Sequence, residues 1–559
     1  MNTVKPVIYQ LMPRWFTNCC EHCVPNGSLA QNGAGKFNDI NDAALRAIAN
    51  MGATHVWYTG IIRHATTTDY TAHGIPGCHP GIVKGKAGSP YAITDYYDVD
   101  PDLAVNVDKR MQEFCRLVER THVNGLKVII DFVPNHVARQ YRSTAKPHAI
   151  KDLGADDNNG MFFDPGNDFY YITGQPFTPQ GVDIGGYHEC PAKATGNDCF
   201  HASPGVNDWY DSVKLNYGVD PWNGSRHFHP IPGSWHKMLQ ILLFWAGHQV
   251  DGFRCDMAHM VPVEFWHWAI AQVKKVRPDI IFIAEIYDPA IYRSYIHQGG
   301  FDYLYDKVTL YDTLRGILTQ GWPACALTGC WQQVHDIREH MLSFLENHDE
   351  QRLASSQFCD DPFKALPALV AACTFSQGPF MLYAGQELGE KGADAEGVSG
   401  NDGRTTIFDY WSVSTLRRWN HHGEFSYTQL SERERELRKY YQRLLRLCNQ
   451  NDCLRQGGFF DLMYANQDLL DAHRHYAYLR HHNGKTVLVT VNFSDHAAEV
   501  GVRFPGHALE CACLAPGQYQ AEELLTGATT FFSLDKERIF CHRLPANGAT
   551  LWHLSPCQN

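Results

Sequence analysis

An arginine and an aspartate two residues apart end an apolar segment at residues 250–256, which read VDGFRCD. In a β-strand, side chains alternate between faces, so Arg254 and Asp256 lie on one face while Phe253 and Cys255 lie on the other. A guanidinium beside a carboxylate forms a strong, directional hydrogen bond. A lone exposed ion pair is common and contributes little, so the remaining segments of the chain decide whether this pair does chemistry.

Polar side chains end three further apolar segments of the chain. The segments DFVPNH, AEIYD and ENHDEQR supply Asp131, Asn135, His136, Glu285, His348, Asp349 and Arg352. Four such ends facing one place would bury unpaired charge at a high cost unless they formed a site. We therefore interpret the four segment ends as parts of one functional site.

The segments that carry these residues belong to a set of eight apolar runs with helical patterns between them. The runs cover residues 8–13, 54–60, 126–133, 250–256, 279–286, 301–306, 341–347 and 379–385. Residues 111–118 and 437–448 repeat apolar side chains at helical spacing. This alternation predicts a parallel (β/α)8 barrel, whose strands are buried on both sides and whose active site lies at their carboxyl ends.

Two stretches interrupt this alternation. Residues 137–232 are rich in Gly, Pro, Asn and Asp and are too long for an ordinary βα loop. After residue 452, short β-like runs are separated by turn signals such as NG and PG. We predict an α/β fold in which residues 1–136 and 233–452 form the barrel, residues 137–232 form an inserted subdomain, and residues 453–559 form a C-terminal antiparallel β-sandwich.

Composition narrows the class of protein. The chain has 559 residues, 44% hydrophobic and 19% charged, with a net charge of -12 and no basic stripe, which argues against a nucleic-acid partner. The opening MNTVKPVIYQLMPRWF lacks an apolar signal-peptide core, and no run of 18 apolar residues occurs. We expect a cytoplasmic protein without a membrane segment, and its oligomeric state stays open.

The polar segment ends, in this order, resemble the signatures of the α-amylase family of glycoside hydrolases. DFVPNH is similar to the first signature, GFRCD to the second, the glutamate of AEIYD to the third and ENHD to the fourth. The opening IYQLMPRWF, the insertion and the final sandwich extend the resemblance over nearly the whole chain. SVKLNYG, with Lys214 and Asn216, resembles the fifth signature in its neopullulanase-like MPKLN form.

The resemblance implies a retaining mechanism, in which two carboxyl groups about 5 Å apart act as nucleophile and acid. Asp256 corresponds to the nucleophile, Glu285 to the acid and Asp349 to a third carboxylate that binds sugar hydroxyls. Crowding by the other two carboxylates would raise the pKa of Glu285. The implied substrate-binding residues are Tyr91, His136, Arg254, His348, Arg352 and Lys214. The last of these could instead pin the insertion to the barrel.

The sequence does not support a metal cofactor. The acid-rich calcium loop that some members of the family carry after the first strand is absent from CVPNGSLAQNGAGKF. Members of the family also often have Lys-His after the nucleophile, where this chain has His259-Met260. Asn135 could still bind calcium together with the insertion, or it could serve only as a hydrogen-bonding group. We predict no metal.

The segment NCCEHC could bind a metal away from the predicted active site. It contains Cys19, Cys20, His22 and Cys23, and its C-x-x-C spacing could hold zinc or a disulfide. A zinc site would need a second pair of ligands, which Cys78-His79 could supply only by folding back.

The resemblance implies hydrolysis of α-1,4-glucosidic bonds in starch or maltodextrins. An α-glucosidase, a transglycosylase or a neopullulanase-like enzyme that also cleaves α-1,6 bonds would use the same residues. A sugar-binding barrel without activity is the alternative from another class, and would be expected to lack the catalytic acids and to carry a membrane anchor. A metal-dependent barrel hydrolase would need an H-x-H pair on the first strand, where YQLMPRWF has none.

Overall fold

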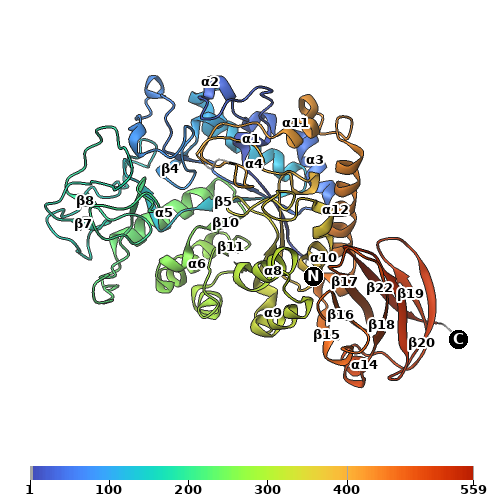
Figure 1. The fold of residues 1–559 in the computed structure, drawn as a ribbon. Coiled ribbons are helices and arrows are strands. Elements are labelled where there is room, and N and C mark those ends of the chain that lie inside the picture. The colour runs from blue at the N-terminus through green and yellow to red at the C-terminus, as the bar shows by residue number, and fades with distance from the viewer. Residues whose placement is uncertain (1–3, 399–400, 558–559) are drawn as a thin grey trace.

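A computed structural model describes residues 4–398 and 401–557 of the chain. Eight parallel strands close into a barrel in the order β1-β14-β13-β12-β11-β10-β5-β2 (Figure 1). The strands are β1 Val7–Leu11, β2 His55–Tyr58, β5 Lys127–Phe132, β10 Gly252–Cys255, β11 Ile281–Ala284, β12 Tyr303–Tyr305, β13 Met341–Phe344 and β14 Phe380–Tyr383. Seven lie within one of the eight apolar runs and β1 begins one residue before its run, so the predicted barrel is confirmed.

Helices cover the outside of the barrel. Those that follow or precede the strands are α3 Asp42–Met51, α4 Arg110–Val123, α5 Gly233–Gly247, α6 Val263–Val276, α8 Asp312–Gln320, α10 Leu366–Thr374 and α12 Glu432–Gln450. In α12, Leu437, Tyr441 and Leu444 are buried at helical spacing, as the sequence predicts. This helix begins at Ser431, whose side chain forms a capping box with Glu434.

The barrel interior is filled by large side chains that alternate along the strands with outward-facing ones. Its buried cluster contains Ile8, Trp57, Ile129, Ile283, Tyr305, Leu342, Phe344 and Met381. These side chains close the barrel as a packed core, so only its two end faces can carry a site.

The insertion between β5 and α5 forms two small antiparallel pairs at the left of Figure 1. Strand β6 (His136–Ala138) pairs with β9 (Ser212–Lys214), and β7 (Tyr171–Ile172) pairs with β8 (Ala192–Lys193). A second excursion, which the sequence analysis did not predict, pairs β3 (Ile62–His64) with β4 (Ile93–Val99) between β2 and α4.

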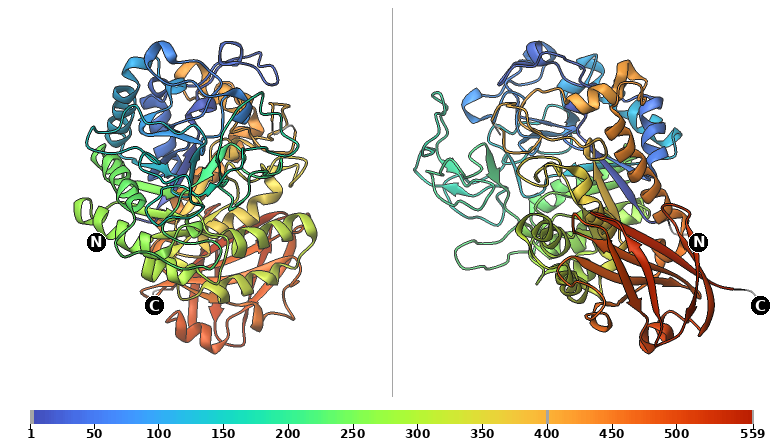
Figure 2. Two further views of the ribbon diagram at one scale, coloured as in Figure 1. Left: turned by 90° about the vertical axis from the view of Figure 1, so that its left-hand side faces the viewer. Right: turned by 45° about the vertical axis from the view of Figure 1, so that its right-hand side comes forward.

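The C-terminal residues form the predicted antiparallel architecture on the far side of the barrel from the insertion (Figure 2). A six-stranded sheet in the order β15-β16-β17-β22-β19-β20 packs against a two-stranded sheet, β18-β21. The strands are β15 Gly458–Asp461, β16 His475–His482, β17 Lys485–Asn492, β18 Ala498–Arg503, β19 Gly517–Glu523, β20 Thr529–Leu534, β21 Ile539–Leu544 and β22 Gly548–Pro556. The Thr490 hydroxyl, on β17, lies 2.9 Å from His542 Nε2, on β21, and so joins the two sheets.

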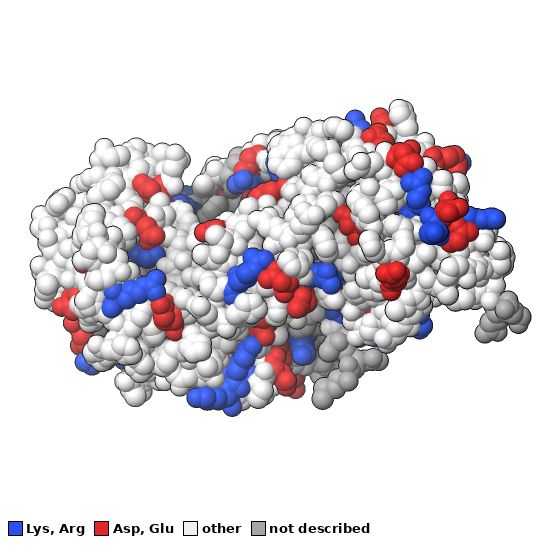
Figure 3. Space-filling model, turned by 90° about the horizontal axis from the view of Figure 1, so that it is seen from below, with Lys and Arg blue, Asp and Glu red and all other residues white. Residues whose placement is uncertain are grey.

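The surface shows acidic and basic side chains interspersed on the face seen in Figure 3. Across residues 4–398 and 401–557, none of the helices combines the length and apolar character needed to cross a membrane.

Candidate active site

The register of two neighbouring strands brings two carboxyl groups together. In the β10–β11 pair Cys255 lies opposite Ala284, so Asp256 and Glu285 follow at the same level of adjacent strands. The Glu285 N–H donates to the Cys255 carbonyl at 3.1 Å and extends the ladder by one residue. Because parallel strands lie about 4.8 Å apart, the two side chains point into the same space at the carboxyl end of the barrel.

Arg254 lies at the centre of the acidic groups. Its Nη1 donates to Asp256 Oδ1 at 2.6 Å, and its Nη2 lies 2.8 Å from Glu285 Oε2. Asp131, its register partner on β5, lies 3.5 Å away. The side chain is 1% exposed, and the guanidinium carbon lies 5.3 to 5.7 Å from the ring centres of Trp57, Tyr91 and Tyr305. One buried cation therefore holds three carboxylates in fixed directions.

Burial raises the pKa values of the carboxyl groups at this site. Burial raises the pKa of Asp256, against the opposing effect of Arg254. Burial also raises the pKa of Glu285, and the charge of Asp256 adds to that rise. Desolvation by the cleft walls, followed by the charge of Glu285, raises the pKa of Asp349 to about 7, although 44% of its side-chain surface is open to the cleft. Burial thus favours the protonated form of each of these three carboxyl groups, against the opposing charge of Arg254.

Two hydrogen bonds fix the orientation of Glu285. The Tyr287 hydroxyl donates to Oε1 at 2.5 Å, and the backbone N–H of Met257 donates to Oε2 at 2.9 Å. Met257 adopts the left-handed conformation, with φ 43° and ψ 44°, which is unfavourable for a residue with a side chain. The turn directly after Asp256 therefore aims a donor at the neighbouring carboxyl.

His348 and Tyr91 form a second wall of the site. Gln10 Nε2 lies 2.8 Å from His348 Nδ1 and donates to it, which places the ring proton on Nε2. That nitrogen lies 2.6 Å from the Tyr91 hydroxyl and 3.1 Å from Asp349 Oδ2. Burial lowers the pKa of His348 well below its usual value. A neutral histidine therefore links Tyr91 to Asp349.

These groups meet in a cleft of about 380 Å3 at the carboxyl end of the barrel. Of the residues predicted from sequence, it is lined by Tyr91, His136, Asp256, Glu285 and Asp349. Arg254 and His348 lie directly behind this lining, in contact with it. Arg352 and Lys214 are not among the residues that line the cleft.

Arg352 lies behind the site and does not reach the cleft. It is fully buried, and its guanidinium donates to Glu346 at 2.9 Å, to the Ala384 carbonyl at 3.0 Å and to Thr405 at 3.0 Å. These contacts tie the loop that carries Asp349 to the end of β14. The predicted substrate contact of Arg352 is therefore corrected to a positioning role.

Lys214 is likewise engaged away from the cleft. Its ammonium donates to Asn135 Oδ1, lies 2.7 Å from Asp198 Oδ1 and donates to the Met260 carbonyl at 3.3 Å. The contacts join the insertion to β5 and to the turn after β10, which supports the alternative that Lys214 pins the insertion. Calcium binds amide, carboxylate and carbonyl oxygens of this kind. Here the lysine ammonium already contacts these oxygens and balances the charge of Asp198, so these residues do not fit a calcium ion.

We expect EDTA to leave most of the activity in place, because the Lys214 ammonium supplies the positive charge at this junction. Lys214→Met should lower activity and the melting temperature together, because it leaves Asp198 without its partner. Activity assays and thermal unfolding with and without EDTA check this, with Lys151→Ala, which breaks an exposed pair with Asp156, as the control. A large loss of activity in EDTA that calcium reverses would contradict the role of Lys214 at this junction.

The cysteines of the segment near the N-terminus do not line this cleft. Cys19, Cys20, Cys23 and Cys78 have free thiols. Among the residues that the structure describes, no three His, Cys, Asp or Glu side chains come together as a possible metal site. The predicted zinc alternative for NCCEHC has no second pair of ligands in this arrangement.

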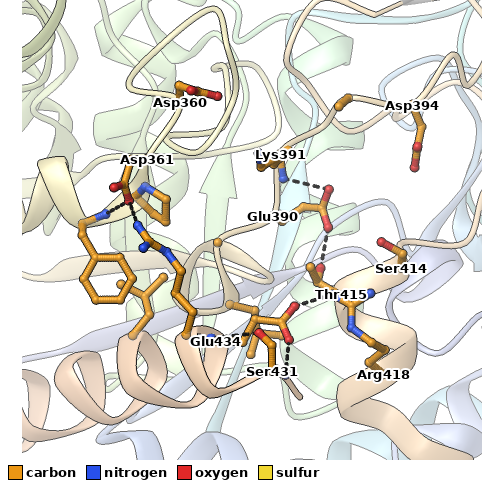
Figure 4. Close-up of a pocket in the computed structure, with 17 residues that line it drawn as sticks. Asp360, Asp361, Glu390, Lys391, Asp394, Ser414, Thr415, Arg418, Ser431 and Glu434 are labelled. Carbon is orange, nitrogen blue, oxygen red and sulfur yellow. Dashed lines mark hydrogen bonds and ion pairs between the residues drawn. The ribbon is translucent and has the colours of Figure 1, made fainter. Parts of the chain in front are cut away.

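A second cavity, of about 510 Å3, lies between the loops after β13 and β14 and the start of α12 (Figure 4). Three of its carboxylates accept hydrogen bonds from backbone N–H groups. Asp361 accepts from the Phe363 N–H at 3.0 Å, Glu390 accepts from the Lys391 N–H at 2.9 Å, and Glu434 accepts from the Ser431 N–H at 2.7 Å. The cleft at Asp256, in contrast, gathers carboxyl groups from adjacent strand ends around one buried arginine, so it is the candidate active site.

Several cleft residues were missed by the sequence analysis. They are Lys84, Ser89, Ala92, Trp209, Asp211, Ser212, Met257, Tyr287, Ile407 and Phe408. Tyr287 stands two residues after Glu285 and could have been found from that spacing. The others come from loops and the insertion, where no period in the sequence indicates which side chains face inward.

Tyr287→Phe should shift the pH dependence of the enzyme. The Tyr287 hydroxyl stabilises ionised Glu285 and so lowers its pKa, within an overall rise caused by burial. Without the hydroxyl the pKa of Glu285 rises, so the alkaline limb of kcat/KM should move to higher pH. Tyr292→Phe, whose hydroxyl lies near Asp306, Asp312 and Asp288 instead, is the control. An unchanged or lowered alkaline limb in Tyr287→Phe would overturn the assignment.

The fold and the site together define a (β/α)8-barrel protein with a carboxylate pair and a guanidinium at the carboxyl ends of its strands. A family model described as "Alpha amylase, catalytic domain" matches residues 10–183 and 232–457. The chain therefore belongs to the α-amylase family. The interruption of the match falls within the insertion.

Individual relatives agree with this assignment. An "Alpha-amylase" of Streptomyces lividans is 26% identical over 68% of this chain and 43% of its own length, and a "Cyclomaltodextrinase" of Geobacillus thermopakistaniensis is 23% identical over 84% of this chain and 67% of its own. The chain thus spans less than half of the first relative. Among solved structures, a noncanonic maltogenic alpha-amylase from Thermotoga neapolitana has the same fold, with a TM-score of 0.63 and 19% identity over 99% of both chains.

Proposed function

We propose that the protein hydrolyses α-glucosidic bonds of α-glucans by a retaining double displacement. The observation that carries this proposal is the placement of Asp256 and Glu285 at adjacent strand ends, joined through one buried arginine. A short separation between two carboxyl groups suits a nucleophile and an acid, whereas an inverting pair would need room for a water molecule between them.

In the first step, an Asp256 oxygen attacks the anomeric carbon while Glu285 gives its proton to the glycosidic oxygen, and the sugar–oxygen bond breaks. The product is a glycosyl ester of Asp256 and a free sugar hydroxyl. In the second step, Glu285 takes a proton from water, the water oxygen bonds to the anomeric carbon, and the ester bond breaks. Two inversions give overall retention.

The residues around the pair have roles that follow from their chemistry. Arg254 keeps Asp256 ionised and aimed, because it donates directly to Oδ1. Asp349, His136 and the linked Tyr91 line the cleft, where an acceptor, an imidazole and an aromatic face suit sugar hydroxyls and a pyranose ring. His348 holds Tyr91 in position.

We propose α-1,4 bonds of starch or maltooligosaccharides as the main substrate, with α-1,6 cleavage, α-glucosidase action or transglycosylation as the alternatives. Support for α-1,4 bonds comes from relatives named alpha-amylase and cyclomaltodextrinase. Lys214 is engaged with Asn135 and Asp198, and Asn216 is buried and donates to the Asp164 carbonyl at 2.9 Å, which weighs against the contact with an α-1,6 linkage that these two residues suggested.

The test is to incubate the protein separately with maltotetraose, soluble starch, pullulan and isomaltose, and to follow products and their anomeric form by NMR. We expect α-anomers to appear first from maltotetraose and starch. Panose or maltose from pullulan would favour the neopullulanase-like alternative, and cleavage of isomaltose alone would favour an α-glucosidase. Initial β-anomers would contradict retention, and no cleavage of any glucan would contradict the proposed function.

A further inference from the structure

One end of the catalytic cleft is bridged by an ion pair between two separate segments. Lys84, in the loop between β3 and β4, lies 3.2 Å from Asp211, in the insertion. Both line the cleft, and their side chains are only 22% and 4% exposed. The Lys84 ammonium also lies 5.4 Å from the ring centre of Tyr210. With one partner buried and the other largely so, this pair differs from a solvent-exposed surface ion pair.

The loop that carries Lys84 is held against the insertion. The His79 N–H donates to Gln140 Oε1 at 2.6 Å, and the His79 ring packs against Tyr187 with 5.7 Å between ring centres. A side chain at Gly81 would collide with the carbonyl of Ile184, so the two backbones are in direct contact. The loop and the insertion therefore form a continuous wall.

The other flank of the same loop is held against the segment after β14. The N–H groups of Ala87 and Gly88 both donate to the Phe408 carbonyl, at 3.0 and 3.2 Å, and Phe408 lines the cleft. Arg14 donates to the Ile407 carbonyl at 2.9 Å. Residues 79–92, 209–212 and 407–409 thus close one end of the cleft. We call them the end wall.

Glu285, Tyr287 and Met257 line the opposite side of the cleft. They follow β11 and β10, which lie across the barrel from β2 and β14, the strands whose loops carry most of the end wall. Next to the turn that follows Met257, a further cavity of about 630 Å3 is lined by His259, Met260 and residues of the insertion. Because Glu285 protonates the oxygen of the leaving sugar, the leaving part of the chain lies on this side, and the end wall faces the glycosyl part.

We propose that the end wall makes this protein exo-acting: it accepts the non-reducing end of an α-glucan and releases short fragments from that end, and it does not cut within a chain. The proposal rests on the proposed function. The cleft volume of 380 Å3 is near the lower limit of small-molecule sites. A cleft of this size suits the terminus of a glucan chain and not a glucan chain that runs through it. Lys84 and Asp211 are the specificity-determining residues.

The test compares maltoheptaose, labelled at its reducing end, with the same sugar capped by a 4,6-O-ethylidene group at its non-reducing end. We expect the cap to lower kcat/KM at least 100-fold, and the first products from the uncapped sugar to be short unlabelled fragments. Equal rates, or early products cut in the middle of the chain, would overturn exo-action. If neither sugar is cleaved, the proposed hydrolysis of α-glucans is wrong, and the question of exo-action does not arise.

A variant pair tests the wall itself. Lys84→Met keeps the side-chain stem but removes the charge, so the wall should loosen and the ratio of capped to uncapped cleavage should rise at least tenfold. Asp211→Asn should act in the same direction. Lys151→Ala, in an exposed pair of the insertion, should leave the ratio unchanged. An unchanged ratio in both wall variants, with folding verified by thermal unfolding, would overturn the role of the ion pair.

Discussion

Replacement of Asp256 by Asn should lower turnover of maltotetraose by roughly four orders of magnitude or more, because an amide cannot form the glycosyl ester. The fold should persist, since Arg254 keeps Glu285 and Asp131 as partners. The matched control is Asp306→Asn, which changes a buried aspartate directly after β12 that does not line the cleft. Single-turnover assays together with thermal unfolding separate loss of chemistry from loss of structure.

Chemical rescue identifies the role of Asp256 independently of the rate. In Asp256→Gly, azide can enter the space that the carboxylate leaves and attack the anomeric carbon while the leaving sugar departs. We expect a glycosyl azide of inverted, β configuration, because a single displacement replaces two. Near-normal starch hydrolysis by Asp256→Asn, or an α-azide from Asp256→Gly, would end the proposed mechanism.

Replacement of Glu285 by Gln should lower kcat/KM for maltotetraose by about 10²- to 10⁴-fold, the usual contribution of a general acid. A substrate that needs no protonation, such as α-maltotriosyl fluoride, should lose far less in its first step. Gln retains the size of Glu. Its amide oxygen can accept from the Met257 N–H and its NH2 group can donate to the Tyr287 hydroxyl oxygen, so orientation is largely kept.

The comparison of two leaving groups is the decisive measurement for Glu285. The ratio of kcat/KM for the fluoride to that for maltotetraose should rise by at least an order of magnitude in Glu285→Gln. Tyr287→Phe, which removes a positioning contact and not the acid, should change that ratio little. Equal losses on both substrates would indicate that Glu285 shapes the site without donating a proton.

Much of the fold follows from local sequence patterns. Strands buried on both faces of a parallel barrel must be apolar throughout, so runs such as LKVIIDFV and DIIFIAEI identify β5 and β11 directly. The insertion and the C-terminal sheets were visible because they break the strand–helix alternation. The β3–β4 hairpin was not predicted, since β3 has only three residues and β4, ITDYYDV, carries two aspartates.

The residues of the carboxyl cluster were also accessible from the sequence. Asp256 and Glu285 each follow an apolar strand, and the parallel barrel necessarily gathers strand ends at one face. Their mutual distance and shared arginine depend on the register of β10 against β11, which periodicity does not specify. The order of the motifs in the sequence predicted the residues of the candidate active site, and the hydrogen-bonded register of β10 and β11 determined their geometry.

The sequence by itself determined the barrel, the two segments that interrupt its strand–helix alternation, and the carboxylates at its strand ends, because these depend on patterns within single segments. Tertiary structure alone decided the positions of Arg352 and Lys214 and the pairing of Lys84 with Asp211. Each depends on contacts between segments far apart in the chain: Lys214 meets Asn135 on another element, and Lys84 crosses the cleft to the insertion. A long cationic side chain can extend toward several carboxylates. Which one it contacts depends on how the loops pack, and loop sequences lack the periodic pattern that would predict this packing.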